Sequence, residues 1–298
     1  MFKQIVVGAD EHESTRDAIA LAKTLLARDG EITLAHVLAH DGHGYRGPSA
    51  AYEAAGWASA AELLENVRDK AGVEAHLRWQ VAGSVGRGLH ELCELTGADL
   101  LAVGSSRRGL LGRVLLGDDT QGALDGAPCA IAIAPTCYSR EPVAMREIGV
   151  GYNGTPESEH ALELARRIAA GTGARLSAFE AVSLSASRFE ARLFRLSDAI
   201  DTLVKEARER LTALGGVEAH VTYGDAAEEL ALYSASLDLL VVGSRGYGPL
   251  GRLIHGSTSR KLMRMARCPL LVLPRSARVI VAGEAEKTGR EPVAGVKG

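Results

Sequence analysis

The sequence predicts an α/β protein made of two tandem doubly wound domains, each a five-stranded parallel sheet flanked by helices. Three observations predict this class. The chain has 298 residues, about twice the length of a usual domain. It contains an internal repeat, and in each copy short apolar runs alternate with amphipathic stretches. Such alternation favours parallel strands joined by right-handed helical crossovers.

The repeat is clearest in a stretch that begins at Asp99 in the first copy and at Asp238 in the second. Residues 99–105 read DLLAVGS and residues 238–244 read DLLVVGS, and the match continues without a gap to Pro135 and Pro274. Each copy also opens alike, with IVVGAD at 5–10 and IGVGYN at 148–153. A duplicated sequence predicts a duplicated fold.

The repeat sets the expected domain limits. We expect the first domain at 1–137 and the second at 145–275, with 136–147 as a linker that holds Pro142 and several charges. After Pro274 the apolar pattern ends, and the mixed Gly, Lys, Glu and Pro of 276–298 predict a disordered tail.

The elements of the first copy follow from its apolar runs. Strands are expected at 4–9, 32–38, 75–81, 100–103 and 130–134. Helices are expected near 14–28, 54–71, 85–96 and 120–125. Residues 39–56 contain several Gly and predict a long loop, either a plain surface loop or a lid over the first site.

The second copy repeats this order. Strands are expected at 148–152, 175–182, 217–223, 239–242 and 270–273. Helices are expected near 158–170, 198–214, 226–236 and 259–267.

Composition excludes several classes of protein. A net charge of -3 with mixed signs gives no broad basic surface for nucleic acid and no polybasic membrane anchor. The start of the chain runs directly into a predicted strand, and no run approaches the roughly 20 apolar residues of a membrane span. We therefore expect a cytoplasmic protein whose partners are small molecules or other proteins.

Four cysteines, Cys93, Cys129, Cys137 and Cys268, form no C-x-x-C pair and no metal-ligand spacing with the nine histidines. Cys129 and Cys268 lie in apolar runs, where cysteine usually serves as a small buried hydrophobe. The sequence thus predicts reduced thiols and no metal site.

A glycine-rich loop at 243–259 is the strongest candidate for a binding site. It follows the buried strand at 239–242 and leads into an amphipathic helix through Ser257, Thr258 and Ser259. Free N–H groups and hydroxyls at a helix N-terminus bind phosphate. In an open parallel sheet, ligands bind past the carboxyl ends of the strands, so Asn153, after the first strand of this copy, is expected beside the loop.

Two better-known phosphate motifs do not fit this loop. Gly251-Arg252 lacks the Lys-Ser/Thr that completes a P-loop. Residues 246–251 spell G-x-G-x-x-G, but they follow a late strand, and no acidic residue stands about 20 positions on. The loop is therefore neither a P-loop nor a dinucleotide fingerprint.

The loop does resemble the nucleotide motif of the universal stress protein family, G-x2-G-x9-G-S/T, at Gly243, Gly246, Gly256 and Ser257. The similarity extends over nearly all of residues 1–275, including the first strand and helix of each copy. The resemblance implies a tandem member with an adenine nucleotide alpha hydrolase-like fold. It further implies that the protein binds ATP, or AMP or ADP, with Mg possible beside ATP, and has no established turnover chemistry.

Residues of the nucleotide site are carried over from the resemblance by position. In the second copy they are Tyr152, Asn153, Ala181, Val242, Gly243, Arg245, Gly246, Tyr247, Gly256, Ser257, Thr258 and Ser259. The weaker candidates of the first copy are Asp10, Val37, Gly104, Arg107 and Gly117.

The two copies differ at the positions that would touch phosphate. The first copy keeps the family's Asp at Asp10, but Arg107 replaces the second glycine and Asp118 replaces the Ser/Thr. A carboxylate at a helix N-terminus occupies the field that a phosphate would use. The second copy has an intact motif but Asn153 in place of Asp. We expect ATP to bind the second copy, and the first copy to bind it poorly unless Arg107 and Arg108 hold phosphate themselves.

Two further features carry predictions. Asp99 and Asp238 each open a buried strand at its amino end, away from the ligand side, which favours a capping role over acid chemistry. The last strands, 130–134 and 270–273, are apolar edge strands, and family members pair through this strand. We expect the copies to join edge to edge as an internal pseudo-dimer, and whether two chains associate further is left open.

Three functions compete. The leading hypothesis is an ATP-binding stress protein that acts as a nucleotide-gated signalling or interaction module on an unknown protein partner. The second is a nucleotide-free scaffold of the same fold, which the change at Asn153 and the altered first copy favour. The third, a weak ATPase, is the least supported, because no Walker lysine and no general base can be named.

Overall fold

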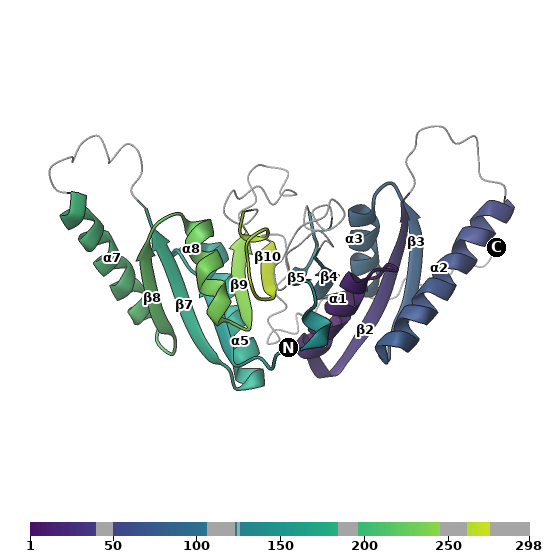
Figure 1. The fold of residues 1–298 in the computed structure, drawn as a ribbon, viewed down its shortest axis with the longest axis horizontal. Coiled ribbons are helices and arrows are strands. Elements are labelled where there is room, and N and C mark those ends of the chain that lie inside the picture. The colour runs from purple at the N-terminus through teal and green to yellow at the C-terminus, as the bar shows by residue number, and fades with distance from the viewer. Residues whose placement is uncertain (40–49, 106–122, 124–125, 184–195, 245–260, 275–298) are drawn as a thin grey trace, which may run out of the picture.

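The computed structural model describes residues 1–39, 50–105, 123, 126–183, 196–244 and 261–274 (Figure 1). The tail at 276–298 lies outside these residues, as does most of the helix expected near 120–125. Of the helix expected near 259–267, residues 261–267 are described, and only 261 and 262 are helical. Within the described part of the chain, no helix is long and apolar enough to cross a membrane.

The first half follows the predicted order of elements. Its strands are β1 (Phe2–Gly8), β2 (Leu26–Ala39), β3 (His76–Ala82), β4 (Leu100–Gly104) and β5 (Ala130–Ala134). Its helices are α1 (Glu13–Leu25), α2 (Ala50–Ala71) and α3 (Val85–Thr96). A short 3-10 helix, η1 (Tyr138–Arg140), stands in the predicted linker.

The second half repeats the pattern. Its strands are β6 (Glu147–Gly151), β7 (Arg175–Val182), β8 (Glu218–Tyr223), β9 (Leu239–Ser244) and β10 (Leu270–Pro274). Its helices are α5 (Pro156–Thr172), α7 (Leu196–Ala213) and α8 (Ala226–Tyr233), with a 3-10 turn, η2 (Ser234–Ser236), after α8.

All ten strands form one sheet in the order β3-β2-β1-β4-β5-β10-β9-β6-β7-β8. Pairing is parallel within each half, and β5 and β10 pair antiparallel, with Leu271 opposite Ala132. The predicted doubly wound halves and their edge-to-edge junction are confirmed. In Figure 1 the halves form the arms of a V that meet at β5 and β10, with α2 and α7 at its outer ends.

Helices cover both faces of the sheet, and each face has its own core. One core contains Leu21 of α1, Leu64 of α2 and Leu211 of α7, together with residues of α5. The other contains Leu89 of α3 and Leu230 of α8. Each core includes residues of both halves, so the pairing of β5 with β10 makes each core continuous from one half to the other.

Predicted boundaries were wrong in two regions. The helix expected to reach residue 28 ends at Leu25, and the strand expected at 32–38 already begins at Leu26, because Leu26 is extended and pairs with Phe2 of β1. The loop expected at 39–56 is too long, because α2 begins at Ala50. Both differences depend on contacts with distant segments, which local periodicity does not encode.

Asp99 and Asp238 lie at the amino edge of the sheet, as predicted. The Asp99 carboxylate accepts the N–H groups of Lys3 and Gln4 at 2.8 and 3.0 Å. The Asp238 carboxylate accepts those of Arg146 and Glu147 at 2.8 and 2.9 Å. Their role is thus to fix the start of the neighbouring strand.

A basic side chain caps the second helix of each half in the same way. The ammonium group of Lys23 donates to the carbonyls of Ala71 and Gly72 at 3.0 and 3.1 Å. In the second half, Arg166 donates to the carbonyls of Leu214 and Gly215 at 2.6 and 3.0 Å. These caps make Ala71 the counterpart of Leu214, and Gly72 the counterpart of Gly215.

The linker is held by Asp17, a carboxylate of α1 that is only 3% exposed. Asp17 accepts the N–H groups of Cys137 and Ser139, both at 2.8 Å. Cys137 has a φ of 67°, an uncommon conformation for a residue other than glycine. The buried carboxylate therefore fixes the turn through which the chain leaves β5.

Cys129 and Cys268 are buried, as predicted, whereas Cys137 in the linker is half-buried. Cys93, Cys129 and Cys268 are buried free thiols. Burial raises the pKa of Cys268 well above its ordinary value. The Cys268 thiol therefore stays protonated and acts as a small apolar side chain of the core.

We predict that Asp17→Ala lowers the free energy of unfolding by about 3 kcal/mol, because two backbone N–H groups of the linker lose a charged acceptor. Urea unfolding followed by circular dichroism measures the change. Asp29→Ala is the matched control, since Asp29 pairs with Lys3 while both side chains are more than 60% exposed. An Asp17→Ala protein as stable as the control would contradict the assigned role.

Candidate functional site

The candidate site lies where β6 and β9 end side by side. Gly151 of β6 pairs with Val242 of β9, so Asn153 follows at the same sheet edge as Gly243. In the first half, Val7 pairs with Ala102, so Asp10 and Gly104 lie together at the carboxyl ends of β1 and β4. The predicted meeting of the first and fourth strands of each copy is confirmed.

Several predicted site residues lie outside the described residues. They are Arg245, Gly246, Tyr247, Gly256, Ser257, Thr258 and Ser259 of the second half, and Arg107 and Gly117 of the first. Their roles stay predictions from the sequence.

Glycine is required at the head of each loop for a steric reason. A Cβ at Gly243 would overlap the carbonyl oxygen of Glu157 at the start of α5. A Cβ at Gly104 would overlap the carbonyl oxygen of Ser14 in α1. Both glycines therefore let a strand end pass directly against a helix N-terminus, and both halves keep this close approach.

Asn153 and Asp10 occupy the same kind of turn. The Oδ1 atom of Asp10 accepts the His12 N–H at 2.8 Å and the Thr15 hydroxyl at 2.7 Å. The Oδ1 atom of Asn153 accepts the Thr155 hydroxyl at 2.7 Å and, more weakly, the Thr155 N–H at 3.3 Å.

These bonds decide what each side chain offers a ligand. Asp10 keeps a second carboxylate oxygen as an acceptor. Asn153 uses its oxygen within the turn and keeps its amide NH2 group, which donates. The sequence argument that Asn preserves an acceptor is therefore incomplete, because Thr155 already engages that acceptor.

The apolar members of the site separate by face. Ala181 and Val242 pack with the core beneath α8, and Val37 packs with the same core in the first half. Tyr152 is different, because its ring is 6% exposed and belongs to the opposite core. Burial raises the pKa of its phenol. Tyr152 can therefore contribute only backbone atoms to a ligand at the strand ends.

Sequence reasoning missed Ser244, the residue directly after Gly243. Its side chain is 1% exposed, and its hydroxyl is the one buried side-chain group among the described residues that has no hydrogen-bond partner. The equivalent hydroxyl in the first half, that of Ser105, lies 3.1 Å from the Thr136 hydroxyl. The signal was present as Gly-Ser in both copies, but only the structure shows that one hydroxyl is satisfied and the other is not.

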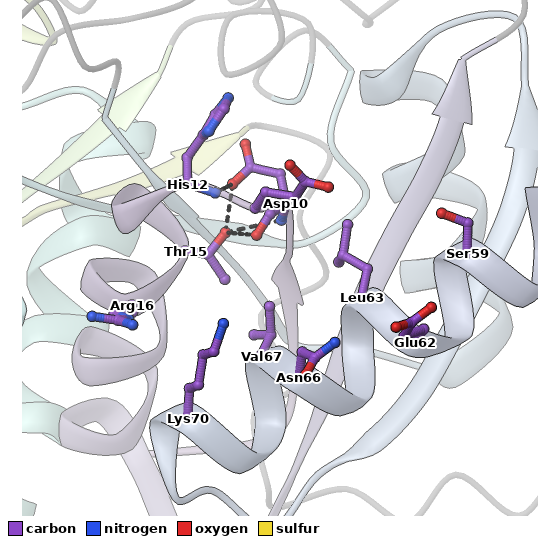
Figure 2. A pocket seen from close by; sticks show the side chains of 11 residues that line it. Asp10, His12, Thr15, Arg16, Ser59, Glu62, Leu63, Asn66, Val67 and Lys70 are labelled. Atoms are coloured by element: carbon purple, nitrogen blue, oxygen red, sulfur yellow. Dashed lines mark hydrogen bonds between the residues drawn. The ribbon is translucent and has the colours of Figure 1, made fainter.

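A separate cavity of about 500 Å³ opens in the first half, on the face covered by α1 and α2 (Figure 2). We call it the α1–α2 cavity. The turn after β1 and the start of α1 contribute Asp10, Glu11, His12, Thr15 and Arg16. One face of α2 contributes Ser59, Glu62, Leu63, Asn66, Val67 and Lys70. Val37 and Gly104 do not line it, so among the described nucleotide candidates of that half only Asp10 is shared with it.

In the second half, an ion pair occupies the corresponding space. Arg210 of α7 donates to Glu180 of β7 at 2.7 and 3.2 Å. The hydrogen bond to Glu180 raises the pKa of Arg210. The Arg210 Cδ lies 3.5 Å from the point where a Cβ of Gly154 would stand, so the side chain reaches the turn after β6.

The fold defines a tandem α/β protein of two doubly wound halves, with the adenine nucleotide alpha hydrolase-like fold. The family model of the universal stress protein family matches residues 1–135 and again 145–274. The chain belongs to the universal stress protein family, as a member with two tandem domains.

Relatives and solved structures agree with this assignment. A universal stress protein of Mycobacterium tuberculosis is 28% identical over 229 residues, which is 73% of this chain and 78% of that protein. A universal stress protein structure from Archaeoglobus fulgidus has a TM-score of 0.66 at 18% identity and covers 91% of this chain and 98% of its own. A Pseudomonas aeruginosa structure described as a putative universal stress protein has a TM-score of 0.60 at 20% identity, with 91% and 93% coverage.

We predict that Arg210→Met destabilises the protein by about 2 kcal/mol, because Glu180 keeps only 8% of its side chain exposed and loses its partner. The value falls below the roughly 3–5 kcal/mol of a fully buried pair because the Arg210 side chain is 43% exposed. Thermal and urea unfolding measure it.

Two variants test the cause of this loss. The double variant Glu180→Met/Arg210→Met removes both charges and is expected to recover most of the stability. Lys205→Met, which breaks an exposed pair with Glu209, is the control and is expected to leave stability unchanged. Equal losses in the single and double variants would rule out an unpaired Glu180 charge as the cause.

Proposed function

We propose that this protein is a nucleotide-gated signalling or interaction module that binds an adenine nucleotide, ATP in the first place, at the strand ends of its second half. The observation that carries the proposal is the junction of Asn153, Gly243 and Ser244. The carboxyl ends of two neighbouring strands, a glycine at a helix N-terminus and a buried hydroxyl without a partner meet there. The carboxyl ends of the strands are the usual ligand position in open parallel sheets.

The residues present fit a nucleotide. Ala181 and Val242 provide an apolar wall that suits an adenine ring. The Asn153 amide group donates toward a ribose oxygen, and the Ser244 hydroxyl supplies a polar group at the head of the loop. By sequence, Gly246, Gly256, Ser257, Thr258 and Ser259 hold the phosphates, beside Arg245 and Tyr247.

The two halves are proposed to differ in nucleotide binding. In the first half Ser105 is already hydrogen-bonded to Thr136, and the sequence places Arg107 and Asp118 where the second half has Gly246 and Ser257. Asp10 retains a free acceptor, but the phosphate positions carry a carboxylate. The first half therefore serves as a structural partner of the second and not as an equal nucleotide site.

A bound nucleotide supplies the negative charge and polar surface that a protein partner can recognise. Asn153, Gly243 and Ser244 position it at an edge of the sheet from which a partner can read it. Mg is expected to arrive with ATP.

A second candidate function is a nucleotide-free scaffold that acts through protein contacts alone. The observation that favours it is the Asn153 oxygen, which the turn already uses, so a ribose hydroxyl has no acceptor there. The nucleotide content of the purified protein separates the two functions. Protein that is purified empty and stays empty in an ATP titration supports the scaffold.

We predict that the full chain binds one ATP and that Gly246→Trp abolishes binding, because an indole at this position obstructs the phosphates. Arg107→Trp, the same substitution at the matching position of the first half, is expected to leave affinity and stoichiometry unchanged. Isothermal titration calorimetry measures both. Two ATP molecules per chain, or equal losses in both variants, would contradict the proposed asymmetry.

We also predict that Asn153→Asp tightens ATP binding by about tenfold, because it restores a charged acceptor for the ribose. The matched variant Asp10→Asn, in the first half, is expected to change ATP affinity by less than about twofold. Titration of each variant provides the comparison. Unchanged or weaker binding by Asn153→Asp would show that the side chain at 153 does not accept from the nucleotide.

A further inference from the structure

We propose that the α1–α2 cavity is a second ligand site and that it takes an extended zwitterion, with a carboxylate at one end and a cationic amine at the other. Basic amino acids and ω-amino acids are the matching class. The site lies in the opposite half from the proposed nucleotide site and on the opposite face of the sheet. It does not depend on nucleotide binding.

Four of the charged side chains that line the cavity lie toward two different ends. Lys70 and Arg16 lie at one end, and Figure 2 shows the Lys70 side chain reaching from α2 into the space between the helices. Asp10 and Glu62 lie toward the other end. Glu62 and Lys70 are eight residues apart on α2, which is about 12 Å along the helix axis. A ligand that bridges both ends must therefore carry opposite charges on an extended chain.

An apolar strip connects the two charged ends. Leu63 and Val67, on the same face of α2, are half-buried and pack against the core between α1 and α2. A methylene chain would cover these side chains. A cavity of about 500 Å³ is within the roughly 300–1,000 Å³ typical of small-molecule sites.

The charges face the cavity without being paired across it. Arg16, Glu62 and Lys70 make no ion pair or hydrogen bond with any of the residues that the structure describes. Lys23 of α1, by contrast, donates to the carbonyls at the end of α2 and does not line the cavity. Donors and acceptors that converge on one cavity from two helices are available to a ligand.

In the second half a charged side chain crosses the corresponding space. The caps on α2 and α7 place Ala71 opposite Leu214. Four residues before each of these, about one helical turn, Val67 of α2 is therefore the counterpart of Arg210 of α7. Arg210 crosses to Glu180 and to the turn after β6, whereas the short side chain of Val67 leaves the same space open. The first half thus has an open, charged cavity where the second half has an internal ion pair.

The test titrates L-lysine and 6-aminohexanoate into the full chain, with binding followed by calorimetry. Both are expected to bind saturably with a Kd of about 1 mM or tighter. Cadaverine lacks the carboxylate and norleucine lacks the terminal amine, and each is expected to bind at least about tenfold more weakly. Saturating ATP is expected to leave lysine binding unchanged, because the two sites are separate.

Variants locate the site. Lys70→Met and Glu62→Gln alter exposed side chains at opposite ends of the cavity, and each is expected to weaken lysine binding at least about tenfold. Glu65→Gln, an exposed residue of α2 that does not line the cavity, is the matched control and is expected to bind normally. Val67→Arg is expected to remove binding by occupying the space, while the thermal unfolding midpoint confirms a folded protein.

The proposal is overturned if neither probe binds saturably to the folded wild-type chain. It is also overturned if cadaverine and norleucine bind as tightly as lysine, since the cavity would then not recognise a carboxylate and an amine at opposite ends of the chain. Equal losses in Glu65→Gln and Glu62→Gln would place binding elsewhere. Loss of ATP binding by Gly246→Trp, with lysine binding retained, would show that this site and the proposed nucleotide site act independently.

Discussion

The antiparallel pairing of β5 with β10 is the contact on which the rest of the molecule depends. Leu270, Leu271 and Val272 pair with Ile133, Ala132 and Ile131, and all six residues are fully buried. Left unpaired, either strand would be an exposed apolar edge prone to association. Pairing them extends both cores across the two halves, so that the duplicated chain folds as one ten-stranded sheet.

Two carboxylates, the buried Asp17 and the half-buried Asp238, support the chain next to this junction. Asp17 holds the linker as it leaves β5, and Asp238 fixes the first residues of β6. The strand-fixing bonds of Asp99 and Asp238 recur in both halves, and so does the capping by Lys23 and Arg166. Divergence between the halves is found instead at the carboxyl ends of the strands and between the first two helices, where a ligand can reach. Duplication therefore preserved the scaffold and left these positions free to change.

Two pairs of matched positions show how the halves have diverged. Ser105 is hydrogen-bonded to Thr136 whereas Ser244 has no partner among the described residues, and Arg210 closes a space that stays open beside Val67. The first pair favours nucleotide binding in the second half. The second pair favours a different ligand in the first half. A shared sheet with a continuous core on each face links the two proposed sites, so the halves are complementary parts of one molecule.

The sequence alone determined the duplicated α/β fold, the order of the strands along the chain, the junction of 130–134 with 270–273 and the placement of Asp99 and Asp238 at the amino edge. The fold and the two aspartates follow from apolar periodicity and from the repeat. The junction follows from the apolar last strands together with the resemblance to the family. Only the tertiary structure decided that α1 ends where Leu26 meets Phe2, that Thr155 engages the Asn153 oxygen, and that the Tyr152 ring faces away from the ligand edge. It also revealed the unpaired Ser244 hydroxyl and the α1–α2 cavity. These features depend on which distant residues become neighbours, and therefore on packing that no local pattern records.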